Sequence, residues 1–224
     1  MTRDPYKDYE RTRFKPDSRR DAVWAEIIRH LERRLGAPEA MLDLGSGFCH
    51  SINASSARDR YALDLRPEAA RHATSGVQTH TGPCNDLSWL ASESCSWVLA
   101  SNLFEHLPRL VLDETLDEVK RVLRADGVLI VIQPNFALVQ ASYFDDFTHL
   151  AESIFTDVSM GDYLSSSGFD IHVAQKRFIP FSMKERLPTH PLLVRGYLNS
   201  PFKPWAGQML VVARKPNTSN PPQR

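Results

Sequence analysis

The sequence has no excess charge of either sign and no long hydrophobic run. Its 27 Lys and Arg residues balance 27 Asp and Glu residues. A chain without a basic excess has no bulk attraction for nucleic acid. No stretch approaches the roughly 18 consecutive apolar residues that a membrane-spanning helix needs. These absences predict a protein that binds neither nucleic acid nor a membrane.

Cysteine is also scarce. The chain has three cysteines, Cys49, Cys84 and Cys95, and their spacing matches no zinc motif. An odd number of cysteines without a signal peptide is typical of a reducing compartment. We therefore expect a cytoplasmic protein without structural disulfides.

Short apolar segments alternate with helical patterns along most of the chain. This alternation predicts an α/β fold, in which helices cover both faces of a parallel sheet. Strands are expected at 40–44, 60–65, 76–82, 96–102, 127–135, 170–178 and 207–215. Helices are expected at 17–36, 111–127 and 153–169, where apolar residues recur at helical spacing.

The other segments suggest one domain with additions. Residues 17–215 are predicted to form the domain, preceded by an arm over 1–16 and followed by a disordered tail over 216–224. A proline-rich insertion at 179–206 carries several aromatic residues. Long insertions in compact domains are usually functional. We expect this one either to cover an acceptor pocket or to form a contact between two copies, so the protein is a monomer or a homodimer.

The segment "LDLGSGFCHS" (42–51) places two glycines directly after the first strand. Gly45 and Gly47 permit a close approach of the backbone to a ligand. Asp64 ends the next strand, about twenty residues later, where an acidic side chain commonly binds a ribose diol. A dinucleotide loop needs a third glycine where His50 stands. The loop therefore favours a cofactor without phosphates over NAD.

Five segments together resemble the class I S-adenosylmethionine-dependent methyltransferase family of the type 11 kind. They are "LDLGSG", "ALDL", "NDL" (85–87), "ASNLFEHLP" (100–108) and "RVLRADGVLIVIQPN" (121–135). The resemblance implies a Rossmann-like sheet of seven strands, the last one antiparallel, flanked by helices. It implies S-adenosylmethionine as the cofactor and S-adenosylhomocysteine as the product.

The resemblance also assigns positions in the cofactor site. The methionine end would lie against the glycine loop, the ribose and adenine against the ends of the next two strands, and the methyl donor beside the fourth strand. The residues implied are, in that order, Asp43, Gly45, Ser46 and Gly47; Asp64 and Leu65; Asp86 and Leu87; Asn102 and Leu103. Two residues depart from the pattern: Cys49 replaces a frequent glycine and Ser96 a frequent aspartate.

The segment "YFDDFTHL" (143–150) gathers Asp145, Asp146 and His149 after the fifth strand. Ligands bind at the carboxyl ends of parallel strands. The cluster can supply a base with an orienting carboxylate, hold a divalent metal, or cap the next helix. No third protein ligand is evident in the sequence, so no metal is predicted. His106 is a further candidate base, or a structural element at a helix start.

These features predict a methyltransferase that acts on a small-molecule acceptor. The candidate catalytic residues are His149, Asp146 and His106, and the candidate acceptor-binding residues are Asp145, Tyr143 and Arg177. Segments 143–150, 177–188, 194–198 and 207–215 resemble a subgroup associated with bacterial glycan or secondary-metabolite clusters. We expect O-methylation of a sugar or glycosylated metabolite. The alternatives are N-methylation, a non-catalytic cofactor-binding scaffold, and an NAD-dependent oxidoreductase.

Overall fold

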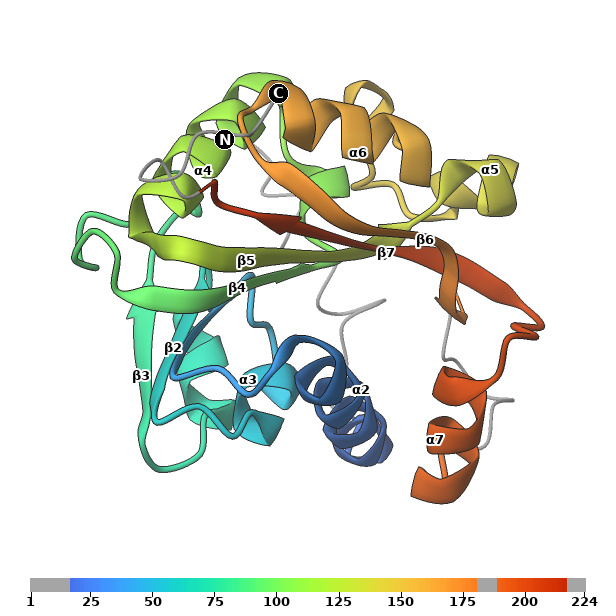
Figure 1. Cartoon of the computed structure of the whole chain (residues 1–224), viewed down its shortest axis with the longest axis horizontal. Coiled ribbons are helices and arrows are strands. Elements are labelled where there is room, and N and C mark those ends of the chain that lie inside the picture. Colours follow the sequence, from blue (N-terminus) through green and yellow to red (C-terminus); the bar gives the residue numbers. More distant parts are fainter. Residues whose placement is uncertain (1–16, 181–188, 217–224) are drawn as a thin grey trace, which may run out of the picture.

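A computed structural model describes residues 17–180 and 189–216 of the chain. Seven strands in this part form one sheet with the order β3-β2-β1-β4-β5-β7-β6 (Figure 1). Strand β7 runs opposite to the other six. The strands are β1 (Ala40–Leu44), β2 (Asp59–Asp64), β3 (Val77–Thr81), β4 (Cys95–Ser101), β5 (Leu123–Pro134), β6 (Asp170–Pro180) and β7 (Ala206–Arg214). The predicted Rossmann-like methyltransferase sheet is confirmed.

Helices cover both faces of the sheet. On one face lie α4 (Arg109–Val122) and α6 (Asp157–Ser166); on the other lie α2 (Arg19–Leu35), α3 (His50–Ala54) and α7 (Pro191–Asn199) (Figure 1). Shorter elements join the strands: η1 (Pro67–His72), η2 (Phe104–His106), α5 (Phe136–Val139), η3 (Gln140–Asp145) and η4 (Ala151–Ser153). Each face has its own hydrophobic cluster, so burial against two layers fixes the central strands.

Two predicted helices are shorter in the structure. The segment predicted as a helix over 111–127 ends at Val122, and β5 begins at the next residue. The segment predicted over 153–169 begins only at Asp157, because Thr156 caps it reciprocally with Ser159. Polar capping groups and the start of the sheet therefore set the ends of these helices, which apolar spacing alone does not reveal.

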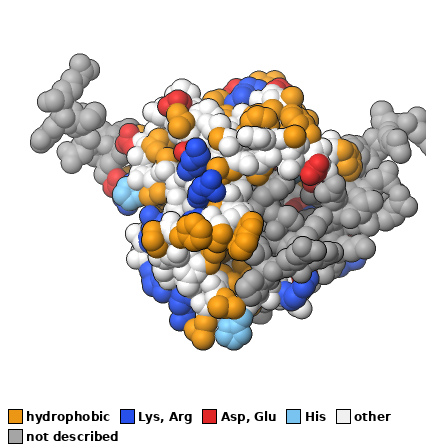
Figure 2. Space-filling view, turned by 90° about the vertical axis from the view of Figure 1, so that its right-hand side faces the viewer, with side chains coloured by type: hydrophobic (Ala, Val, Ile, Leu, Met, Phe, Trp, Pro, Cys, Tyr) orange, Lys and Arg blue, Asp and Glu red, His pale blue; other side chains and the backbone are white. Residues whose placement is uncertain are grey.

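The insertion at 179–206 contains more regular structure than the sequence suggested. It includes the end of β6 and the nine-residue helix α7. The Lys203 ammonium group donates to the carbonyls of Tyr197 (2.7 Å) and Leu198 (2.8 Å) near the end of this helix. An apolar groove of about 450 Å³ lies along α7, and hydrophobic side chains gather on this end of the molecule (Figure 2).

Several predictions fall outside the described residues. They concern the arm over 1–16, the tail beyond residue 216, and the part of the insertion at 181–188. Among the helices that the structure describes, none combines the length and hydropathy required to cross a bilayer.

Candidate functional site

The glycine loop follows β1 and bends sharply. Gly45 and Gly47 have φ angles of 67° and 54°, a region that residues with a Cβ rarely adopt. A Cβ atom added to Gly45 would lie 3.0 Å from Cδ1 of Leu103. The absence of a side chain therefore lets the loop backbone approach the end of β4. Two of the predicted cofactor residues, Gly45 and Leu103, therefore lie together.

Cys49, which stands where the family pattern often has glycine, has the backbone conformation of a glycine. Its φ angle is 56°, which is the conformation that glycine adopts most easily. The side chain is fully buried, and burial raises the pKa of the thiol to about 11. Cys49 is therefore an uncharged wall residue of the loop and no nucleophile.

Asp43 is buried beneath the same loop. Its carboxylate accepts a hydrogen bond from the hydroxyl of Ser51 on α3. Burial raises the pKa of Asp43 to about 7, although the bond from Ser51 opposes this shift. Asp43 thus joins β1 to the short helix that follows the loop.

Asp64, the predicted ribose ligand, ends β2 beside the loop. Its Oδ2 accepts from the Gly47 amide (2.8 Å), and its Oδ1 accepts from the Arg66 amide and Nε (both 3.0 Å). A carboxylate has about four acceptor positions, so three are in use. The remaining position, together with the one that Arg66 Nε would release by turning away, fits a ribose diol. The glycine cradle and this carboxylate are therefore compatible with S-adenosylmethionine.

The predicted adenine residues differ in accessibility. Leu65 is 59% exposed and Asp86 is exposed, whereas Leu87 is fully buried in the core. Asp86 accepts from the side chain and the amide of Ser88, and both bonds lower its pKa. Leu65 and Asp86 thus lie at the surface, while Leu87 supports the segment from below.

Asn102 and Ser46 occupy two other predicted positions of the cofactor site. Asn102 follows β4 with a φ angle of 50°, and its Oδ1 accepts from Nε2 of Gln208 on β7 (3.0 Å). Ser46 is buried in the glycine loop, and its amide donates to the Leu63 carbonyl of β2 (2.9 Å). Both residues are therefore held by neighbouring strands.

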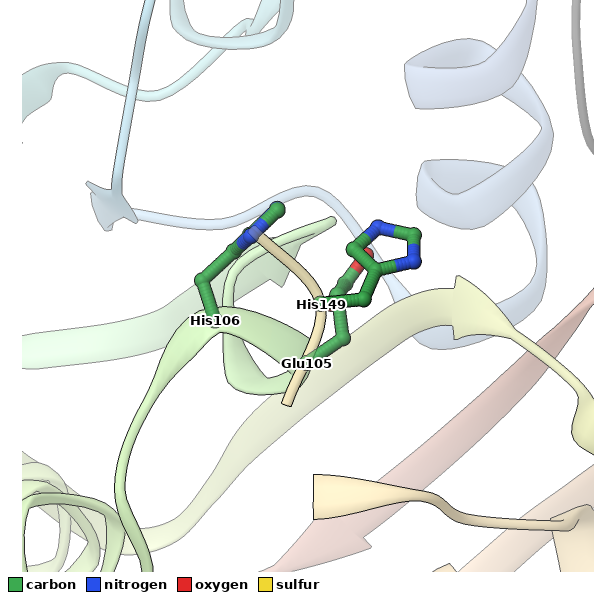
Figure 3. A group of neighbouring side chains, drawn as sticks. All are labelled: Glu105, His106 and His149. Atoms are coloured by element: carbon green, nitrogen blue, oxygen red, sulfur yellow. The ribbon is translucent and has the colours of Figure 1, made fainter. Parts of the chain in front are cut away.

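A second polar cluster lies past the end of β4. Glu105 and His106 are consecutive residues of η2, and His149 comes from the loop between η3 and η4 (Figure 3). One potential ligand atom from each of the three side chains lies within 4.8 Å of the others. The structure thus brings together His106 and His149, which the sequence analysis had considered separately.

Glu105 is the residue of this cluster that sequence reasoning missed. Its side chain is fully buried, and neither carboxylate oxygen has a hydrogen-bond partner in the structure. Burial raises the pKa of Glu105 to about 8, and the nearby charge of Asp146 adds to this shift. An acidic residue inside an apolar helix start was the only signal in the sequence, and it also fits a structural role.

His106 is oriented by the loop that carries His149. Its Nδ1 lies 3.0 Å from Oγ1 and 3.3 Å from the carbonyl oxygen of Thr148. Thr148 in turn donates through Oγ1 to Oδ1 of Asp146 (2.7 Å). Burial lowers the pKa of His106 to about 4, so this imidazole is neutral at pH 7.

The Asp146 carboxylate bonds within its own loop, to Thr148. Oδ1 accepts from both the amide and the hydroxyl of Thr148. Burial alone would raise the pKa of Asp146, but these bonds lower it below the usual value. The predicted catalytic role for Asp146 is therefore better described as positioning of His106 through Thr148.

His149 is fixed by a bond to the backbone. Its Nδ1 lies 2.6 Å from the Tyr143 carbonyl oxygen, so Nδ1 carries the proton and Nε2 carries the lone pair of the neutral ring. The Tyr143 side chain, predicted to contact the acceptor, is instead fully buried, and its hydroxyl donates to the Ser153 carbonyl (3.1 Å). Tyr143 holds the loop from within.

The other two predicted acceptor residues are exposed. Asp145 ends η3 beside the cluster, whereas Arg177 lies on the edge strand β6, near Tyr197 of α7. Neither residue is among the three that share the cluster.

The comparisons with known proteins agree on the fold. Residues 42–131 match a family model described as a methyltransferase domain. No curated protein matches the chain. A S-adenosylmethionine-dependent methyltransferase from Archaeoglobus fulgidus is 17% identical, with a TM-score of 0.65, and the alignment covers 95% of this chain and 100% of the other.

Two further solved structures show what this fold carries. The 1,6-didemethyltoxoflavin N1-methyltransferase of Burkholderia thailandensis, with bound S-adenosylhomocysteine, is 17% identical with a TM-score of 0.59, covering 95% of this chain and 84% of that one. The [4+2]-cyclase SpnF is 15% identical with a TM-score of 0.61, covering 86% and 80%. The fold alone therefore does not fix the reaction.

The domain match lies on the segment that holds the glycine loop, Asp64 and the Glu105–His106 pair. The surrounding sheet has the strand order and the antiparallel β7 described above. Together, the comparisons show that residues 42–131 are similar to a methyltransferase domain and that the described chain has the fold of solved S-adenosylmethionine-dependent methyltransferases.

Proposed function

We propose that the protein transfers a methyl group from S-adenosylmethionine to an oxygen atom of a small-molecule acceptor. The observation that carries this proposal is the position of the histidine cluster. Glu105 and His106 follow Leu103, the residue that contacts Gly45 of the cofactor loop. A proton-handling cluster next to the expected methyl donor is what an acceptor hydroxyl requires.

Different residues of the chain serve the cofactor side and the acceptor side of the site. The glycine loop and Asp64 bind the cofactor, which supplies an activated methyl group on a sulfonium when bound. Asn102, held by Gln208, and Leu103 border the donor side. His149 receives the hydroxyl proton of the acceptor, and the neutral His106 orients the acceptor; each ring is held by a backbone or threonine contact at Nδ1.

An oxygen acceptor is favoured over an amine by the chemistry of the cluster. A hydroxyl must lose a proton to become a good nucleophile, whereas a neutral amine already has a usable lone pair. Two oriented imidazoles beside a buried carboxyl group are unnecessary for an amine. We propose a sugar or a glycosylated secondary metabolite as the acceptor class, because of the subgroup that the sequence resembles.

Two substitutions test the cofactor side and the acceptor side of the site separately. Asp64→Ala should weaken S-adenosylmethionine binding about tenfold or more, because a hydrogen bond to a charged group contributes about 1.5–3 kcal/mol. His149→Ala should leave that affinity unchanged and lower turnover of an O-methylated acceptor found by screening hydroxylated compounds with methyl-labelled cofactor. Calorimetry and label transfer give the two readouts.

Two results would contradict the proposal. Unchanged cofactor affinity in Asp64→Ala would remove the ribose assignment. Full turnover in His149→Ala, or label transfer only to amines in the screen, would remove the assigned role of the histidine cluster in O-methylation. Exposed His172 on β6 gives the matched control, because His172→Ala should change neither quantity.

A further inference from the structure

We propose that Glu105, His106 and His149 form a binding site for one divalent transition-metal ion. Two imidazoles and one carboxylate make a ligand set found in catalytic zinc sites and in non-haem iron sites. The three side chains come from two segments, η2 and the loop after η3, that meet only in the folded chain (Figure 3).

The burial of the Glu105 carboxylate is the observation that favours a bound cation. The carboxylate is fully buried and both oxygens lack a hydrogen-bond partner. A buried charge without a partner is costly, and buried carboxylates are normally paired or coordinate metals. The charged group that acts on Glu105 is another acid, Asp146, so the local field also favours a cation.

The hydrogen bonds at Nδ1 of the two histidines are like those that usually hold metal-binding imidazoles. A ligating histidine usually donates its second ring N–H to a carbonyl or carboxylate, which fixes the ring and its tautomer. His149 donates from Nδ1 to the Tyr143 carbonyl at 2.6 Å. His106 has its Nδ1 against Thr148, whose hydroxyl is bound to Asp146. In the neutral ring that these bonds favour, the lone pair therefore lies on Nε2 of each histidine.

The separations allow coordination after a small closure. Zinc bonds of about 2.0–2.1 Å in a tetrahedral site place ligand atoms roughly 3.4 Å apart. The present separations reach up to 4.8 Å. Turning His106 and His149 toward Glu105 by roughly an ångström or more at the ring tip brings all three into range.

The ligand types select the kind of metal. Imidazole suits zinc, iron, copper and nickel, whereas magnesium and calcium prefer sites made of oxygen atoms. We infer a Zn²⁺ or Fe²⁺ class of ion with at least one coordination position open, because the protein supplies only three ligands. The open position is suited to a water or to an oxygen of the acceptor.

This last step rests on the proposed methyltransferase function. With the ion bound, the Nε2 lone pairs of His106 and His149 are used by the metal, so the ion takes over the part that the imidazole base has in the metal-free chain. A hydroxyl bound to the metal releases its proton to water more easily and keeps the electron pair on its oxygen. That oxygen then forms the new bond to the methyl carbon while the carbon–sulfur bond breaks and its electron pair returns to sulfur. The metal is unchanged, and the charge of the sulfonium is balanced by the released proton.

The test measures metal binding in the absence of cofactor and acceptor. The tag-free full chain is stripped with a chelator, then titrated with Zn²⁺ by calorimetry and with Co²⁺ by visible absorption. We expect one ion per chain. Glu105→Gln, His106→Gln and His149→Ala should each weaken binding at least about tenfold, the lower range seen even for supporting residues. His172→Ala is the matched control and should bind like the wild type.

Several outcomes overturn the inference. They are a wild-type chain that binds no ion, binding that survives all three substitutions, and binding lost equally in His172→Ala. Circular dichroism identifies any variant that fails to fold, and the near-isosteric Glu105→Gln then decides. Because S-adenosylmethionine binding is measured separately on the same variants, failure of the metal site is distinguishable from failure of the methyltransferase proposal.

Discussion

Glu26 on α2 and Glu105 on η2 are both buried acids, but their surroundings are opposite. Glu26 accepts two bonds of 2.9 Å from the Arg195 guanidinium of α7 and also contacts Arg29. Bonds from Arg195 dominate, and the pKa of Glu26 is lowered to about 2. Neither carboxylate oxygen of Glu105 has a hydrogen-bond partner in the described part of the chain, and burial raises its pKa to about 8.

The difference separates a structural acid from a functional one. Glu26 ties two helices on the same face of the sheet, so its charge is used within the fold. Glu105 lies at the carboxyl end of the sheet, where ligands bind in open α/β folds, and no cation of the described residues is paired with it. Perturbed acids without an internal partner are more informative about function than acids in ion pairs.

The largest expected effect concerns the support behind the histidines. Thr148→Val removes the hydroxyl that links His106 to Asp146, and we expect Zn²⁺ affinity to fall about 10- to 100-fold. Thr148→Ser keeps the hydroxyl and should restore most of the affinity. Equal affinity in all three proteins, measured by calorimetry, would show that this link does not support the metal site.

Next comes the ion pair at Glu26. We expect Glu26→Ala to lower the free energy of unfolding by about 1.5 kcal/mol, the low end for a bond to a charged group, because solvent screens the half-exposed Arg195. Urea unfolding measures this value, with the exposed Glu68→Ala as control. A decrease in the free energy of unfolding no larger than that of the control would mean that the ion pair of Glu26 does not stabilise the fold.

Acid unfolding tests the same contrast. The folded pKa of Glu26 is lowered to about 2 from 4.5, so its contribution is complete above about pH 4.5 and is lost as the pH falls toward 2. We expect the wild type to lose stability over this range more steeply than Glu26→Gln. Parallel curves for the two proteins, followed by circular dichroism, would contradict the pairing.

The smallest expected effect is at Glu105. In the metal-free chain, Glu105→Gln exchanges one buried polar group of this shape for another, and no ion pair is lost, so stability should fall by less than the roughly 1.5 kcal/mol expected for Glu26→Ala. The same variant should lose metal affinity. A destabilisation as large as that of Glu26→Ala in urea would mean that Glu105 has an unrecognised partner in the fold.

The sequence was sufficient for the sheet but only partly for the cluster. Apolar runs such as 127–135 predict buried strands because both faces of the sheet are covered, and the structure confirms β5 there. The glycine loop is local in sequence, so its turn was predictable. The meeting of Glu105 with His149 was not, because it depends on how a loop beyond β5 folds back to η2.

The path of that loop depends on contacts that no local pattern encodes. The Leu150 amide donates to the Glu105 carbonyl (2.9 Å), and the Ser153 hydroxyl donates to the Leu107 carbonyl. The Tyr143 ring fills the space between these segments. In sequence, Tyr143 resembles an acceptor-binding residue as much as a buried one, which explains why its burial was not predicted.

The central claim is that the glycine loop and Asp64 bind S-adenosylmethionine. The most direct measurement is calorimetric titration of the full chain with S-adenosylmethionine and, separately, with NAD. We expect saturable heat with S-adenosylmethionine, lost in Asp64→Ala, and no heat with NAD. Binding of NAD alone, or of both cofactors with equal affinity, would contradict the account.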